Sequence, residues 1–256
     1  MMLLIGKVYL DYLVESSTLD GKSHYLPSPR LGGGLANLFY RQKFLDLLSC
    51  NFSSDTIFCL ISTNLEDQFS SLANKFVSKI VYTPSTPPIA FIIEGSSSRT
   101  SFVSRDSPEP INLPSSHEGL TLLYYADKLK LPKDFHASII FADTACNDEK
   151  DMYFDFKKNA DTVIVGISSE YLTPELLSYY LRMRYKVISH SPRETTIYHE
   201  NNVESIHNDY YISNQSLSVT GLGDQYTYLL ANSIQNGLSL SNSVRKAQLA
   251  MHQVLS

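Results

Sequence analysis

The first third of the chain alternates short apolar runs with polar breaks, and this pattern predicts strands more often than helices. Residues 3–8 form a mainly apolar stretch that is typical of a short buried strand, and residues 9–15 and 24–29 are β-rich. Three consecutive glycines follow. Beyond them, leucine and phenylalanine recur at helical spacing, which predicts a helix over residues 35–48.

The middle of the chain continues this alternation and adds a hairpin. Residues 56–62 are predicted to form a strand and residues 66–76 a helix. After a proline-rich break, residues 89–94 and 100–104 flank a Gly-Ser-Ser-Ser sequence, which is the pattern of two strands joined by a loop.

The second half alternates β-branched runs with helical patterns. Such alternation indicates a parallel sheet covered by helices on both faces, which is the α/β class. The predicted strands are 138–142, 162–166, 186–189 and 195–198, and the predicted helices are 174–184, 224–236 and 240–254.

The early β segments do not fit a strand–helix alternation, so they indicate a small β extension of the α/β body. No internal repeat and no Gly/Ser linker divides the chain. We therefore expect one domain over residues 1–256, with a lid made by strands from about 9–30 and 87–106.

Composition excludes several classes of protein. The 256 residues contain 21 Lys and Arg against 26 Asp and Glu, a formal charge of −5, which argues against a nucleic-acid-binding surface. Hydrophobic residues make up 43%, so the chain is not of the disordered class. No apolar run reaches the roughly 20 residues of a spanning helix, and the N-terminus does not have the pattern of a signal peptide. We expect a cytoplasmic protein that does not bind membranes. Its three cysteines, Cys50, Cys59 and Cys146, are expected to be buried or idle thiols in a reducing compartment.

The most informative stretch is Gly221-Leu222-Gly223-Asp224, which runs directly into a helical pattern. Glycines before a helix let a ligand approach the backbone, and the free N–H groups of the first turn favour an anion such as phosphate. Asp224 beside this cradle could accept the proton of a substrate hydroxyl. Taken alone, the motif also fits an aspartate that only caps a helix after a flexible turn.

Two other features point to a ligand at the same kind of site. The glycines at 32–34 precede a helix that carries Asn37, an amide able to bind a polyhydroxylated ligand. Asp11 follows the first strand, where a carboxylate can reach a ligand at the edge of the sheet. Each also has a simpler interpretation: the glycines form a loop before a helix, and Asp11 is a surface residue.

Together these features resemble the ribokinase-like (PfkB) carbohydrate kinases. Residues 32–37 resemble the G-G-x-x-x-N signature of that family, and residues 221–224 resemble its G-A-G-D signature. Gly6 and Asp11 fit a G-x-x-x-x-D first strand, and residues 90–104, with Arg99-Thr100, are similar to the lid strand. The resemblance spans residues 3–254 and identifies the chain as a divergent and C-terminally short member.

The resemblance implies a Rossmann-like three-layer α/β/α domain with a β-sheet lid, ATP as phosphoryl donor, Mg²⁺, and a sugar or nucleoside acceptor. It assigns the catalytic base to Asp224 and the anion hole to the backbone of Gly221, Leu222 and Gly223. It assigns acceptor binding to Asp11, Gly32, Gly33, Asn37 and Arg99. The donor-side residues would be Glu170, which reaches the metal through water, Ser189, Arg193 and Gln248.

Departures from the family pattern concentrate on the donor side. Leu222 replaces a small alanine, and the N-x-x-E motif keeps Glu170 but not its asparagine. The nucleotide strand, T-x-G-x-x-G in the family, has neither glycine over residues 189–194. Two hypotheses follow: an ATP-dependent kinase, or a catalytically weak or inactive relative that binds a sugar or nucleoside without turnover. In either case we expect a homodimer formed through the lid, since a small sheet exposes an edge and an apolar face.

Overall fold

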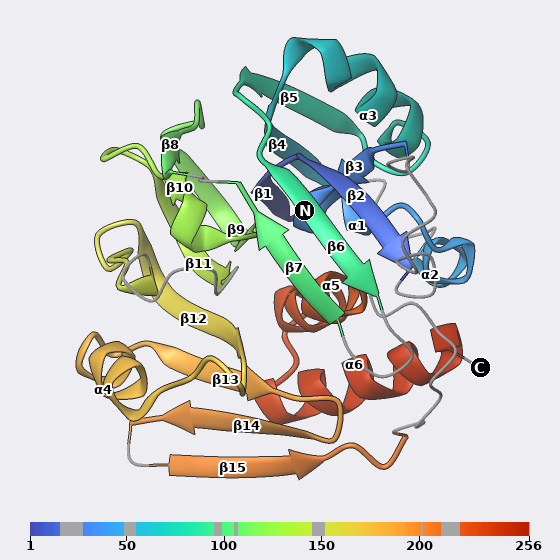
Figure 1. The fold of residues 1–256 in the computed structure, drawn as a ribbon. Helices are drawn as coiled ribbons and strands as arrows, with labels where there is room; N and C mark the ends of the chain where they lie inside the picture. The colour runs from blue at the N-terminus through green and yellow to red at the C-terminus, as the bar shows by residue number, and fades with distance from the viewer. Residues whose placement is uncertain are drawn as a thin grey trace.

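A large twisted sheet forms the centre of the computed structural model, which describes residues 1–15, 28–48, 55–94, 99–104, 107–144, 152–200, 202–210 and 221–255 (Figure 1). Within these residues the sheet has nine strands, in the order β15-β14-β13-β12-β11-β9-β1-β4-β5. The seven strands from β13 to β5 pair in parallel, and β14 and β15 add an antiparallel edge. The strands are β1 (Leu3–Lys7), β4 (Thr56–Ile61), β5 (Lys79–Pro84), β9 (Ser116–Leu123), β11 (His136–Asp143), β12 (Ala160–Ser168), β13 (Lys186–His190), β14 (Glu194–His199) and β15 (Asn202–His207).

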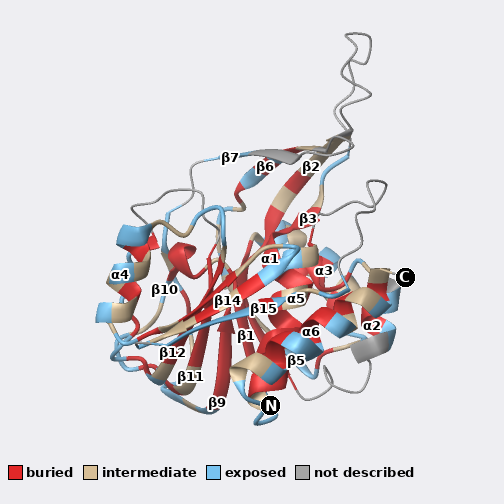
Figure 2. Ribbon diagram, turned by 90° about the horizontal axis from the view of Figure 1, so that it is seen from below, coloured by how far each residue is buried: buried red, intermediate tan, exposed pale blue. Residues whose placement is uncertain are grey.

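Helices cover both faces of this sheet, and the central strands are therefore buried on both sides (Figure 2). One face carries α1 (Gly33–Asn37), α2 (Gln42–Leu48), α3 (Glu66–Ala73), α5 (Leu222–Gln235) and α6 (Leu240–Leu255). The other carries α4 (Pro174–Arg182) and the segment around Phe154 and Phe156. None of the described helices is long and apolar enough to span a membrane.

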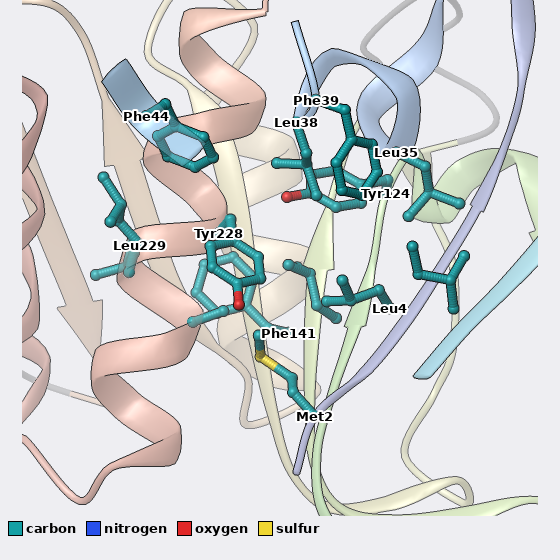
Figure 3. Packing of buried hydrophobic residues seen from close by; sticks show 14 of the residues in the cluster. Met2, Leu4, Leu35, Leu38, Phe39, Phe44, Tyr124, Phe141, Tyr228 and Leu229 are labelled. Atoms are coloured by element: carbon teal, nitrogen blue, oxygen red, sulfur yellow. The ribbon is translucent and has the colours of Figure 1, made fainter. Parts of the chain in front are cut away.

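The core beneath α5 holds that helix against the sheet (Figure 3). The ring of Tyr228 packs edge-on against Phe44 of α2, with centroids 6.3 Å apart, and its hydroxyl donates to Asp55 Oδ2 at 2.8 Å. Asp55 Oδ1 also accepts from the Met2 backbone N–H at 2.9 Å. Burying a large apolar side chain stabilises a fold by about 1.5–3 kcal/mol, so this cluster fixes the position of α5.

A second sheet of four strands lies at one end of the molecule, with the order β3-β2-β6-β7 among the described residues. Its strands are β2 (Tyr9–Glu15), β3 (Arg30–Gly32), β6 (Ile89–Glu94) and β7 (Arg99–Val103). One face packs Tyr9, Ala90 and Ile92 together, and the other exposes Phe91, stacked on Tyr12 with centroids 5.0 Å apart. A two-stranded pair, β8 (Glu109–Pro110) with β10 (Leu129–Lys130), completes the described sheets, and 3₁₀ turns occur at η3 (Thr63–Leu65) and η4 (Ala126–Lys128).

Most predicted elements are confirmed to within a few residues, but the helix expected over 35–48 is wrong as a single element. It consists of α1 and α2 with a break between them. At this break the Tyr40 hydroxyl donates to the Leu31 carbonyl at 2.7 Å, and its ring lies under the Arg30 guanidinium.

The predicted strand over 24–29 lies almost wholly outside the described residues. Cys59 is buried and free, as expected, whereas Cys50 and Cys146 lie outside the described part.

Three strands of the main sheet have no counterpart among the predictions. The central β9 begins with Ser-His-Glu, and the edge strand β15 is mostly exposed and polar, so neither shows the apolar run of a buried strand. β5 is only partly buried along its length.

Candidate active site

The candidate site lies where the N-terminus of α5 meets the carboxyl ends of the central parallel strands. Ligands bind at this edge in open α/β sheets, because the strand order and the helix N-termini leave a crevice there. α5 begins after Gly221, and the Gln225 N–H bonds back to the Gly221 carbonyl at 3.1 Å. The N–H groups of Leu222 and Gly223 belong to the first turn and have no partner within the helix, which suits an anion.

The two glycines at the start of α5, Gly221 and Gly223, differ in what the structure demands of them. Gly221 has φ +82°, and a Cβ there would lie 3.0 Å from the Asn37 Cβ, so both conformation and space favour glycine. Gly223 has an ordinary helical conformation, and no atom would lie within 4 Å of its Cβ. The first turn of α5 is therefore open at Gly223 and closed at Gly221.

Asp224 is held by an amide from a distant part of the chain. Its side chain is at the end of the open turn and the residue is 9% exposed. Asn37 Nδ2 donates to Asp224 Oδ2 at 2.8 Å, and Gln225 Nε2 donates to the Asn37 carbonyl at 3.1 Å. Tyr124, just after β9, donates its hydroxyl to the Asp224 carbonyl at 2.9 Å. These contacts fix both the carboxylate and the backbone of Asp224.

Asn37 has a second polar atom at this point. Its Oδ1 is buried and, among the described residues, has no hydrogen-bond partner. A buried amide oxygen without a partner costs free energy, so this atom is suited to accept a hydrogen bond from a ligand hydroxyl.

The first glycine motif makes room for Asp11 and for the backbone of β1. Asp11 is 3% exposed and lies in β2 opposite Arg30 of β3. A Cβ on Gly32 would fall 2.0 Å from the Asp11 Cγ, and one on Gly33, which has φ +80°, would fall 2.5 Å from the Lys7 carbonyl. The absence of side chains at Gly32 and Gly33 therefore lets the Asp11 carboxylate and the Lys7 carbonyl pack directly against this backbone. Arg99 begins β7 opposite Glu94, and its side chain lies outside the described residues.

The four predicted donor-side residues lie in two turns, in β13 and in α6, and they are not all on one face of the sheet. Glu170 is exposed after β12 and accepts from Ser168 Oγ at 3.4 Å. Ser189 lines a groove of about 310 Å³ together with Leu172 and Tyr198, on the α4 side of the sheet. Arg193 is exposed in the turn between β13 and β14, and Gln248 is buried in α6 on the opposite face from Ser189.

An aromatic contact closes the space between α5 and β13. Tyr226 and His190 have ring centroids 5.5 Å apart, and the Tyr226 hydroxyl bonds to Thr195 Oγ1 at 3.1 Å. Burial raises the pKa of Tyr226 to about 12 and lowers that of His190 to about 4, so both groups are neutral near pH 7.

Sequence reasoning missed several polar residues at this edge of the sheet. Asp143, at the end of β11, accepts from Thr227 Oγ1 of α5 at 3.2 Å. Lys7, at the end of β1, is 1% exposed, and its Nζ lies 2.6 Å from Glu109 Oε1. Asp143 follows an apolar run in the sequence, as Asp11 does, so the same rule that singled out Asp11 could have identified Asp143. The Lys7 pair had no such signal.

Comparison with known proteins finds likeness in structure only. No protein-family model and no curated protein matches the sequence. Among solved structures, a ribokinase from Thermotoga maritima aligns with a TM-score of 0.65 at 12% identity, over 98% of this chain and 91% of that one. An adenosine kinase from Sinorhizobium meliloti gives 0.65 at 14%, over 98% and 92%. A pyrophosphate-dependent kinase in the ribokinase family, complexed with a pyrophosphate analog and myo-inositol, gives 0.56 at 17%, over 97% and 92%.

Proposed function

Because the chain has the ribokinase-like fold, as the glycine motifs and the α/β pattern predicted, we propose that it transfers a phosphoryl group from ATP to a hydroxyl of a small sugar-like or nucleoside acceptor. One observation carries this proposal: a carboxylate, Asp224, held by Asn37 beside the open first turn of α5. A general base and an anion site must be adjacent for this chemistry, and here they share one helical turn.

In the proposed reaction Asp224 accepts the proton of the acceptor hydroxyl. The O–H bond breaks, the oxygen attacks the terminal phosphorus of the donor, and the bond from that phosphorus to the bridging oxygen breaks. The N–H groups of Leu222 and Gly223 stabilise charge on the transferred group, which is the main catalytic term in phosphoryl transfer. The proton on Asp224 then leaves to solvent.

Acceptor binding is proposed for the residues between the two sheets. Asp11 can accept hydrogen bonds from ligand hydroxyls, and the Asn37 Oδ1 can accept one more while its Nδ2 holds Asp224. Gly32 and Gly33 leave the space, and Arg99, at the start of β7, is proposed as a further acceptor-binding residue. In this proposal the four-stranded sheet is a lid that excludes water from the acceptor.

The residues on the donor side suit Mg²⁺ held mainly through water. In the described part of the chain no three acidic, histidine or cysteine residues are grouped as a metal site. Mg²⁺ usually keeps several waters and takes one or two carboxylates plus phosphate oxygens, so the exposed Glu170 fits an indirect role. Mg²⁺ would neutralise charge on the donor phosphates.

Binding without turnover is the second candidate, and the donor side favours it. Ser189 faces the groove on the α4 side and Gln248 is buried on the other face of the sheet, so these two predicted donor-side residues do not line one site. The Tyr226–His190 contact also fills the space between α5 and β13.

A phosphoryl donor smaller than a nucleotide needs less space between α5 and β13. Pyrophosphate therefore belongs in the assay beside ATP.

Turnover over a panel of sugars, polyols and nucleosides, with ATP or pyrophosphate as donor, tests the proposal. We expect phosphorylation of at least one acceptor and a fall in kcat of about 10²–10⁴-fold in Asp224→Asn. Asp134→Asn, an exposed aspartate, is the matched control and should keep full activity. Acceptor binding by calorimetry with no turnover would favour the second candidate, and equal turnover in Asp224→Asn would overturn the first.

A further inference from the structure

Asp143 is a buried carboxyl group directly under the first two turns of α5. It ends β11, and its Oδ1 accepts from Thr227 Oγ1 at 3.2 Å. Thr227 lies three residues after Asp224, so the two side chains are neighbours along one side of the helix. Opposite Asp143 in β12 is Gly166, which offers no polar side chain. Within the described part of the chain, the Thr227 hydroxyl is therefore the hydrogen-bond partner of this carboxyl, and β12 places no polar side chain opposite it.

The charged and titratable groups that face Asp143 from the described residues are acidic. They are Asp224 from α5, Asp127 from η4 and the phenol of Tyr124. Among the described residues no cation is paired with Asp143, and Lys128 Nζ lies 3.4 Å from Asp127 Oδ2. A buried carboxylate with like charges nearby and no cation is costly, so the neutral acid is the favoured form.

Asp224 differs from Asp143 in ways that favour the charged form. It lies in the first turn of a helix, where the dipole stabilises negative charge, and it accepts a hydrogen bond from the Asn37 amide. Burial raises the pKa of Asp143 well above its usual range, and the charge of Asp224 raises it further. The hydrogen bond from Thr227 lowers this pKa by less than either of these raises it, and Asp127 adds a smaller increase.

We propose that Asp143 is a positioning residue that keeps its proton, so that Asp224 carries the single negative charge of the pair. This inference rests on the proposed function, since it gives a role beside the base. Neutral Asp143 anchors α5 to β11 through Thr227, while Tyr124 anchors it at the end of β9. No second carboxylate then repels the phosphates at the anion site. Through turnover Asp143 neither gains nor loses a proton.

Carboxyl ¹³C NMR of the whole protein, labelled at aspartate and titrated without ligand, tests this directly. We expect one carbon to titrate above the usual aspartate range and to be absent from Asp143→Asn. Asp224→Asn removes a neighbouring charge and should lower that midpoint by about one pH unit or more. Thr227→Val removes the hydrogen bond to the charged form and should raise it. The two neighbours therefore shift the same carbon in opposite directions.

Asp134→Asn is the control and should remove only a carbon in the usual range. If Asp143→Asn does not fold, the opposite shifts in Asp224→Asn and Thr227→Val identify the carbon. The inference is overturned if every aspartate titrates in the usual range, if the high midpoint persists in Asp143→Asn, or if Asp224→Asn leaves it unmoved. None of these results affects the turnover assay, so failure here is distinct from failure of the proposed function.

Discussion

Asn37 and Asp224 are 187 positions apart in the chain, yet Asn37 Nδ2 donates a 2.8 Å hydrogen bond to Asp224 Oδ2. The contact joins the two glycine motifs, because each of these residues ends its motif. It also orients the carboxylate that we propose as the base, and a bond of this kind sets catalytic geometry.

Replacing Asn37 with alanine should lower kcat by about 10²-fold, because Asp224 loses its orientation, and should raise the KM for the acceptor. Steady-state kinetics with the acceptor found in the panel measures both. Asn74→Ala, at an exposed asparagine, is the control. Unchanged kcat in Asn37→Ala would remove this bond from the mechanism.

Two alanine variants of the same turn should behave in opposite ways. Gly221→Ala places a side chain at φ +82° and against the Asn37 Cβ, so it should destabilise the fold by about 1–3 kcal/mol. Gly223→Ala enters open space in a helix and should stabilise by up to about 1 kcal/mol, while its methyl group obstructs the donor and raises the donor KM. Urea unfolding measures the changes in stability, and steady-state kinetics measures the donor KM. A Gly221→Ala variant more stable than the wild type would contradict the positive φ at this position.

Asp55 gives a pH dependence of stability with a definite sign. Burial raises the pKa of Asp55, and the bonds from Met2 and Tyr228 only partly offset this. Between the usual and the raised pKa the folded state binds more protons than the unfolded state, so this contribution decreases as pH rises. The free energy of unfolding of the wild type minus that of Asp55→Asn should therefore fall across this window. Urea titrations at several pH values measure the difference, and a rise would refute the assignment.

The Lys7–Glu109 pair should respond unequally to loss of either partner. Lys7 is 1% exposed in its side chain and Glu109 is 32% exposed. Glu109→Gln leaves the more deeply buried charge without its carboxylate and should cost up to about 3–5 kcal/mol, whereas Lys7→Met leaves a carboxylate that water can reach and should cost less. Chemical denaturation of both variants tests the order, which would be reversed if Glu109 were the more desolvated group.

The exposed face of the four-stranded sheet should form a homodimer interface. Phe102 is 60% exposed and pairs across β6 and β7 with Phe91, which stacks on Tyr12. Phe102→Asp should convert a dimer to a monomer in light scattering, whereas Val203→Asp, at a 66% exposed residue of β15, should not. A monomeric wild type would dispose of the proposal.

Local sequence patterns predicted the parts of this fold that depend on neighbouring residues. The apolar runs at β1, β4, β11 and β12 and the helical spacing of α5 were all visible, because each reflects burial of one segment. β9 was not visible, since its polar start hides a strand whose burial comes from β1 and β11 on either side.

By itself the sequence determined the α/β class, the glycines that permit positive φ, and the likeness to ribokinase-like kinases that the solved structures confirm for the fold. Only the tertiary structure decided that Asn37 holds Asp224, that Asp143 lies under the same helix, and that Ser189 and Gln248 are on opposite faces of the sheet. The physical reason is that periodicity and turn chemistry act over a few residues. A hydrogen bond or a buried charge at the site depends instead on which distant segments the packing of the core brings together.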